Sequence, residues 1–88
     1  MKKQQLKPLS LESIKALVAA DAINHVRLAA TADGIQVEIN KNFVVTNRAK
    51  RARFFAKSDT CLGWLHGLGI NRIDEVDLTH WVVKSKQV

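Results

Sequence analysis

The chain has 88 residues and a formal net charge of +6, from 14 Lys and Arg against 8 Asp and Glu. This length allows one domain, and 47% hydrophobic with 25% charged residues is typical of a globular protein and excludes a disordered chain. The positive charge favours nucleic acid, an anionic membrane surface or an acidic protein over neutral small molecules, without distinguishing among these partners.

The amino-acid usage indicates a cytoplasmic protein. Cys61 is the single cysteine, so no internal disulfide can form and nothing points to an oxidising compartment. The first residues, Met1 to Pro8, are basic with no apolar run behind them, unlike a secretory signal. No run of eighteen apolar residues is present, so we expect no membrane span.

The chain is expected to divide into a basic arm, one domain and a basic tail. Residues 1–9 carry three lysines among glutamines and have little to bury, which predicts a flexible N-terminal arm. Residues 10–83 are predicted to form a single α+β domain. Residues 84–88 are predicted to be a frayed basic tail.

A first helix is predicted to begin at Ser10. Ser10 is a good N-cap, and Glu12 lies in the first turn, where the helix dipole favours an acid. The helix is expected to end between Ala22 and Asn24. Apolar residues recur at spacings of three and four and form one face of this helix, namely Leu11, Ile14, Leu17, Val18 and Ala22.

A β-hairpin is predicted on either side of Asp33-Gly34, because apolar and polar residues alternate before and after this turn signal. A two-residue loop at this position sets Ala30 opposite Val37 and Leu28 opposite Ile39. One face of the hairpin is then entirely apolar.

A third strand is predicted from Phe43 to Asn47. The preceding turn, Asn40 to Asn42, is expected to hold Asn42 in a left-handed conformation and to set Phe43 opposite Ile39. Residues 51–55 alternate again and predict either a short fourth strand or an extended lead-in.

A second helix and a final strand complete the predicted domain. Ser58 or Asp59 is expected to cap the helix, and Gly69 with Ile70 to end it in a Schellman motif. Residues 72–78 are predicted to form a strand at the edge of the sheet. They are rich in acids, and charged side chains on an edge strand deter its pairing with the edge of another molecule. Residues 81–83 are expected to close over the core. The inner face of the helix is predicted to carry Cys61, Trp64, Leu65 and Leu68.

The predicted order α-β-β-β(β)-α-β indicates an α+β fold with an antiparallel meander sheet and two helices packed on one face. Its first five elements also match the order of a double-stranded-RNA-binding domain. Element order alone carries no function.

A basic cluster is the strongest candidate for a binding site, because its cations fall within ten residues and no acid interrupts them. The cations could contact phosphates or an acidic protein, including Asp74, Glu75 and Asp77 of another copy, or could form a merely solvated edge. The predicted nucleic-acid or acidic-partner binding residues are Arg48, Lys50, Arg51, Arg53, Phe55 and Lys57.

Neither catalysis nor metal binding is expected. Cys61, His66 and His80 are spaced unlike any common metal site, and no residues are placed by sequence to form a catalytic triad. We therefore expect a non-enzymatic protein without cofactor or metal.

Short motifs are spread along residues 9–81, namely Ala20-Asp21-Ala22-Ile23, Gly34, Arg48, Arg51, Arg53-Phe54-Phe55, Asp59-Thr60, Trp64-Leu65, Gly69-Ile70 and Val76-Asp77. With these motifs the chain resembles the ParC-family partition-associated proteins, which are small and encoded on plasmids. The resemblance implies an accessory role in plasmid partition or maintenance, without ATPase activity. A protein-interaction module, through an acidic partner or self-association, and a small inhibitor carried by a mobile element are the alternatives.

Overall fold

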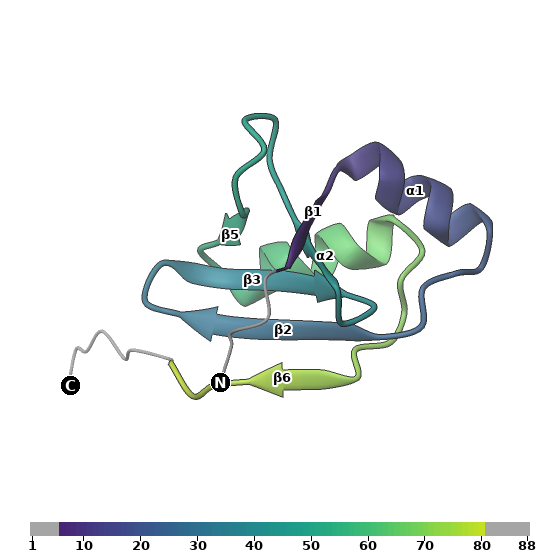
Figure 1. The fold of residues 1–88 in the computed structure, drawn as a ribbon. Helices are drawn as coiled ribbons and strands as arrows, with labels where there is room; N and C mark the ends of the chain where they lie inside the picture. The colour runs from purple at the N-terminus through teal and green to yellow at the C-terminus, as the bar shows by residue number, and fades with distance from the viewer. Residues whose placement is uncertain (1–5, 81–88) are drawn as a thin grey trace, which may run out of the picture.

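A computed structural model describes residues 6–80 and contains two helices and a six-stranded mixed sheet, which confirms the α+β class (Figure 1). The expectations for residues 1–5, for residues 81–83 over the core and for the tail at 84–88 lie outside the described residues. The elements are β1 (Lys7–Leu9), α1 (Leu11–Ala19), β2 (Val26–Thr31), β3 (Gly34–Ile39), β4 (Phe43–Val45), β5 (Phe54–Phe55), α2 (Ser58–Gly67) and β6 (Glu75–Asp77).

The sheet is antiparallel in its centre and parallel at both edges. Its strand order is β1-β4-β3-β2-β6, and β5 pairs with β3 beside β4. β1 runs parallel to β4, and β6 runs parallel to β2. The expected meander, antiparallel throughout, is therefore wrong at the edges. β5 is antiparallel to β3 and therefore runs in the same direction as β2. Helix α2 then returns the chain to the starting end of the sheet, so that β6 also runs parallel to β2.

Part of the expected flexible arm is a strand. Lys7 pairs with Phe43 and Leu9 pairs with Val45. The Thr46 amide donates to the carbonyl oxygen of Leu9 at 3.1 Å, and the Leu9 side chain is 5% exposed. Leu9 belongs to the core, so these residues bury more than their basic sequence suggests.

The β2–β3 hairpin forms with a register two residues away from the expected one. The loop is Ala32-Asp33, so Thr31 lies opposite Gly34 and Leu28 lies opposite Val37. A shift of two leaves every side chain on the same face, because side chains in a strand alternate with period two. The expectation that one face is apolar and buried is therefore confirmed.

Gly34 is the first residue of β3 and not part of the loop, and two observations show why this position requires glycine. Its φ is +129°, a conformation that other residues rarely adopt, and a Cβ at this position would lie 2.8 Å from the carbonyl oxygen of Phe55. β5 thus approaches β3 at a place where only hydrogen fits. The loop is held by Thr31, whose hydroxyl donates to the Gly34 carbonyl at 2.9 Å and accepts from the Asp33 amide at 3.1 Å.

The turn between β3 and β4 sets Phe43 opposite Ile39, as predicted. The left-handed residues, however, are Asn40 and Lys41, with φ of 53° and 67°, and not Asn42. Asn40 is fixed by the connection from α1 to β2. Its side-chain oxygen accepts from the backbone amides of residues 24 and 25 at 2.6 and 3.1 Å, and its side-chain nitrogen donates to the carbonyl of residue 22 at 2.9 Å.

Helix α1 begins as predicted, with the Ser10 hydroxyl accepting from the Ser13 amide at 3.2 Å. It ends at Ala19, earlier than expected, because Asp21 adopts a left-handed conformation with φ of 55°. The amide of Ala22 then donates back to the carbonyl of Leu17 at 2.8 Å, which makes this ending a Schellman motif.

Helix α2 has the predicted end but not the predicted cap. Lys57 occupies the N-cap, and no side chain makes a capping hydrogen bond. Gly69 has φ of 95°, and the Ile70 amide donates to the Leu65 carbonyl at 3.0 Å, so the predicted Schellman motif is confirmed. Cys61 and Leu65 are fully buried on the inner face.

The buried side chains of both helices join the apolar face of the sheet in one core. Ile14 of α1 and Leu65 of α2 pack with Val37 and Ile39 of β3, all at most 2% exposed. Within residues 6–80, neither helix is long and apolar enough to cross a membrane.

Candidate nucleic-acid interface

The chain between β4 and β5 forms a second, shorter hairpin, which we call the basic hairpin (residues 46–53). Thr46 forms an antiparallel bridge with Ala52, and the Arg53 amide donates to the Val45 carbonyl at 2.9 Å. The chain leaves the sheet after β4 and returns to it at β5, and the turn between them is raised above the body of the molecule (Figure 1). This projection makes the turn accessible to a large partner.

The tip of the basic hairpin is an ordered turn. The Lys50 amide donates to the Asn47 carbonyl at 2.9 Å, and the Asn47 amide donates to the Arg51 carbonyl at 2.9 Å. The Asn47 side-chain oxygen accepts from the amides of Ala49 and Arg51 at 2.8 and 3.1 Å. Lys50 is left-handed, with φ of 65°. A turn followed by a left-handed residue is a common way to close a short hairpin, so the cations here have fixed backbone positions.

The structure separates the predicted binding residues into two groups. Four of them have exposed side chains, namely Arg48, Lys50, Arg51 and Lys57. Arg53 and Phe55 pack on the body instead. The guanidinium of Arg53 lies 4.4 Å from the centre of the Phe55 ring and 5.2 Å from that of Trp64, as a cation–π pair does.

Phe55 does not offer a ring to a ligand, contrary to the prediction. It is 3% exposed and packs against Trp64 with ring centres 5.3 Å apart. Its neighbour Phe54, 39% exposed, is the accessible ring. The alternation of residues 51–55 in the sequence showed that Phe54 and Phe55 point to opposite faces of the chain. It did not show that Trp64 of α2 would cover the face that carries Phe55.

A hollow of about 440 Å³ lies between the basic hairpin and the start of α1. Arg48 and Arg53 line it on one side, and Ser10 and Glu12 line it on the other. Glu12 opposes the accumulation of positive charge here. Sequence reasoning missed this neighbourhood, because the start of α1 precedes the basic hairpin by almost forty residues and no local pattern connects the two.

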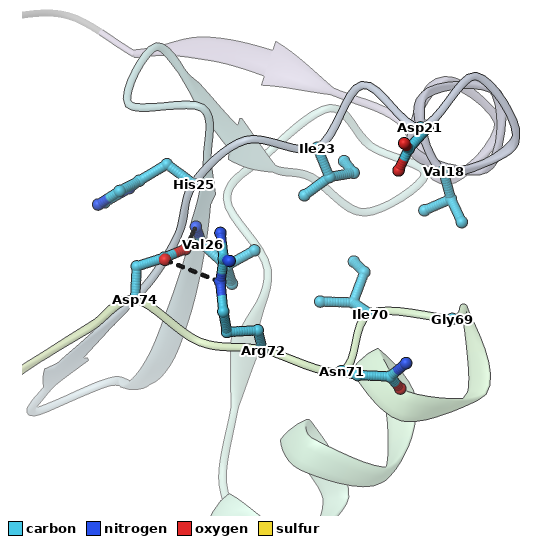
Figure 2. A pocket seen from close by; sticks show the side chains of 10 residues that line it. All are labelled: Val18, Asp21, Ile23, His25, Val26, Gly69, Ile70, Asn71, Arg72 and Asp74. Atoms are coloured by element: carbon cyan, nitrogen blue, oxygen red, sulfur yellow. Dashed lines mark hydrogen bonds and ion pairs between the residues drawn. The ribbon is translucent and has the colours of Figure 1, made fainter.

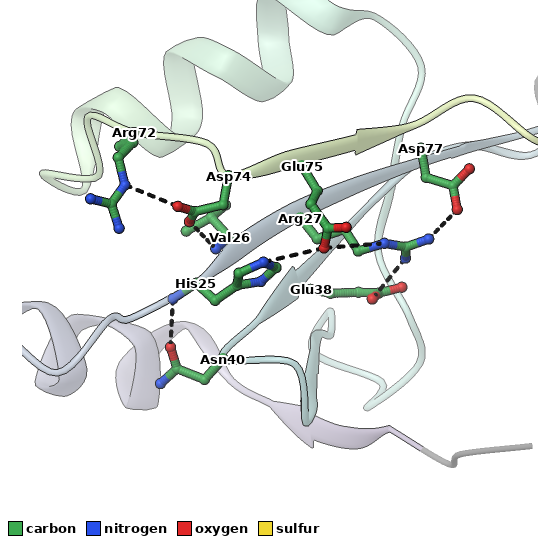
Figure 3. Close-up of polar contacts among 9 residues, drawn as sticks. All are labelled: His25, Val26, Arg27, Glu38, Asn40, Arg72, Asp74, Glu75 and Asp77. Atoms are coloured by element: carbon green, nitrogen blue, oxygen red, sulfur yellow. Dashed lines mark hydrogen bonds and ion pairs between the residues drawn. The ribbon is translucent and has the colours of Figure 1, made fainter.

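Four acids of the described chain cluster around the start of β2, namely Glu38 of β3, Asp74, and Glu75 and Asp77 of β6 (Figure 3). Arg27 pairs with Glu38 at 2.9 Å and also with Asp77, while Glu75 pairs with His25 at 3.2 Å. None of the ion pairs within residues 6–80 includes a residue of the basic hairpin. Its cations thus form no direct ion pair with the carboxylates of the described chain.

Hydrogen bonding and ion pairing lower the pKa of Asp74 and so favour its charged form. The Val26 amide donates to the Asp74 carboxylate at 2.8 Å, and this bond, with the charge of Arg72 at 3.1 Å, lowers the pKa of Asp74. Burial disfavours the charge of Arg27, yet its hydrogen bond to Glu38 and the surrounding acids raise its pKa. These groups stabilise the contact between β2 and β6.

A second hollow, of about 220 Å³, lies beside this cluster (Figure 2). Ile23 and Ile70 face each other across it, and Arg72 and Asp74 lie at its side. The Nδ1 atom of His25 is buried without a hydrogen-bond partner in the described chain. No three His, Cys, Asp or Glu side chains within residues 6–80 are grouped as a metal site requires.

The exposed cations of the basic hairpin, which form no ion pair within residues 6–80, are therefore the candidate binding surface. No family model, curated protein or solved structure matches this chain.

Proposed function

We propose that this protein binds nucleic acid through the phosphate backbone, with Arg48, Lys50 and Arg51 of the basic hairpin as the contact residues. The observation that supports this function is their arrangement. Three exposed cations occupy one ordered, projecting turn, and no ion pair of residues 6–80 involves them. Like charges held this close repel one another, and phosphates placed opposite them relieve that repulsion.

The placement of the aromatic rings favours duplex over single-stranded nucleic acid. Single strands are held largely by stacking bases on exposed rings. Phe55 is buried and Arg53 covers it together with Trp64, so that Phe54, next to the basic hairpin, is the only exposed aromatic ring of residues 46–67. Phosphate contacts then supply the binding energy, and duplex DNA has the higher charge density. Such contacts carry no sequence information, so weak sequence preference is expected.

The proposed role is that of a non-enzymatic, cytoplasmic accessory in plasmid partition or maintenance, as the sequence resemblance implies. A protein that coats plasmid DNA without hydrolysing nucleotide needs only an accessible cationic surface of this kind.

The test measures the affinity for a fluorescent DNA duplex by anisotropy at 50 and 200 mM salt. Three phosphate contacts give a slope of log K against log salt of about −2.7, or roughly a 40-fold loss over this range. Arg48→Glu with Arg51→Glu is expected to abolish most of the binding. Any residual slope is expected to be smaller by about 2, because two contacts are lost.

Lys7→Glu with Lys41→Glu is the matched control. It makes the same change in net charge at the other end of β4, since Lys7 pairs with Phe43 and Lys41 lies in the β3–β4 turn. Equal losses in the two double variants would contradict a localised site. Failure of the wild type to bind any duplex at 50 mM salt would reject the function and leave an acidic protein as the partner for the basic hairpin.

A further inference from the structure

An apolar groove of about 430 Å³ lies between α2 and β6 on the helix-bearing face of the sheet. Leu28 and Ala30 of β2 form its floor, Leu62 of α2 forms one wall, and Val76 with Leu78 forms the other. The three wall residues are 43%, 59% and 60% exposed, respectively. This is a concentrated area of large apolar side chains in contact with solvent.

The groove exists because two helices are too narrow to cover every strand. β6 pairs with β2 so that Val76 lies beside Leu28, and residues paired in this way point to the same face of the sheet. A helix about 10 Å wide covers roughly two strands. Leu28 is buried at 6% exposed, whereas Val76 at the edge is left uncovered.

We propose that the groove is filled by the chain's own Trp81–Val83. Leu78 lines the groove, and the described chain ends two residues later, at His80. The next three residues are Trp, Val and Val, followed by Lys84-Ser85-Lys86. The apolar part of this terminal segment thus begins immediately beside the groove, and a charged part follows.

The local geometry fits this occupant. The Thr79 amide donates to the Asp77 side chain at 2.8 Å, and such an Asx turn bends the chain directly after β6. The indole ring of Trp81 and the side chains of Val82 and Val83 are apolar, and they would shield the exposed side chains of Leu62, Val76 and Leu78 from solvent.

Charge disfavours a second copy as the occupant. Glu75, whose side chain is 55% exposed, and Asp77 follow the same edge as the groove. Two copies that met symmetrically at this edge would bring these acids together, and acids on an edge strand deter such pairing.

The experiment isolates the fluorescence of Trp81 in the full-length chain. Trp64→Phe leaves Trp81 as the single tryptophan and keeps an aromatic ring against Phe55. We expect emission at shorter wavelength, and weaker quenching by acrylamide, than for the same variant unfolded in urea. Leu62→Asp in this background is expected to shift the emission to longer wavelength and to restore quenching.

Leu11→Asp is the matched control, because Leu11 is also a helical leucine, is 40% exposed and lies outside the groove. It is expected to leave the emission of Trp81 unchanged. Val76→Asp, at a more exposed position, replaces Leu62→Asp if circular dichroism shows that the latter is unfolded.

Two results would overturn the proposal. One is an emission of Trp81 that is equal in the folded and unfolded chain, or that the groove variant does not change. The other is a short-wavelength emission that appears only at concentrations where the protein elutes as a dimer, because a second copy would then be the occupant.

Discussion

At the scale of single residues, Lys50 combines a strained backbone with a charge at the tip of the basic hairpin. Its φ of 65° costs a residue with a side chain about 1 kcal/mol, and glycine avoids most of this cost. Lys50→Gly is therefore expected to raise the free energy of unfolding by about 0.5–1 kcal/mol in urea denaturation, while it weakens duplex binding by removing one contact.

Lys50→Ala separates these two effects. It removes the same charge but keeps a side chain in the left-handed conformation. The two variants are expected to lose equal affinity, and only the glycine variant to gain stability. A gain of equal size in both would show that charge repulsion, and not backbone strain, limits stability at the tip.

Asp74 is expected to make the protein sensitive to acid. Its pKa is lowered from the ordinary 3.8, chiefly by the Val26 amide and then by Arg72, so the folded chain binds fewer protons than the unfolded one. The stability that this group contributes is complete above the ordinary value and is lost as the pH falls from about 3.8 toward the lower, folded-state pKa.

Asp74→Asn is expected to flatten that loss, because an amide oxygen still accepts from Val26 but does not titrate. The measurement is the melting temperature at several values between about pH 5 and pH 2. Asp33→Asn, in the exposed loop between β2 and β3, is the control. A decline in acid that is as steep in Asp74→Asn as in the wild type would assign the sensitivity to other groups.

At the scale of elements, the close approach of β5 to β3 depends on Gly34. A Cβ there would meet the Phe55 carbonyl at 2.8 Å, and φ of +129° is strained for any other residue. Gly34→Ala is expected to destabilise the protein by roughly 2 kcal/mol or more in urea denaturation. It should also lower duplex affinity, because β5 supports one side of the basic hairpin.

Gly63→Ala is the opposite case and serves as its control. Gly63 lies within α2, and a Cβ there would have no atom within 4 Å. Alanine is expected to stabilise the helix by about 0.5–1 kcal/mol. Equal effects of the two substitutions would contradict the proposed crowding at Gly34.

The elements that local patterns specify could be predicted, whereas those that depend on distant neighbours could not. Apolar spacing predicted the burial of Ile14 in α1, of Cys61 and Leu65 in α2 and of one face of the β2–β3 hairpin, because it follows from helix and strand geometry alone. It also placed Leu11 on the apolar face of α1, but Leu11 is 40% exposed because the core does not extend to this end of the helix. The strand at Lys7–Leu9 was missed, since only pairing with β4 gives it structure. The parallel edge at β6 was missed for the same reason.

The candidate site shows the same division. Exposure of Arg48, Lys50 and Arg51 was predictable from an uninterrupted run of charge. Burial of Phe55 was not, because it depends on Trp64, which α2 brings back over the sheet.

At the scale of the whole molecule, stability is expected to be unequal across the sheet. β2 and β3 pair over six residues on a buried face, whereas β6 pairs over three and is exposed. Amide hydrogen exchange should be slowest in β2 and β3 and fastest among the strands in β6. The Arg48→Glu, Arg51→Glu variant should keep this order. Equal protection of β6 and β3 would contradict it.

The parallel edges also determine when the native topology can be completed. Strand β1 cannot pair until β4 has been formed, since Lys7 pairs with Phe43. The Val26 amide donates to the Asp74 side chain, which lies 48 positions further along the chain. Such a high contact order slows folding, because long loops close before their contacts form. During synthesis, the β2–β3 hairpin can form as soon as it leaves the ribosome. The sheet gains its last edge only after β6, which ends at Asp77, has emerged as well.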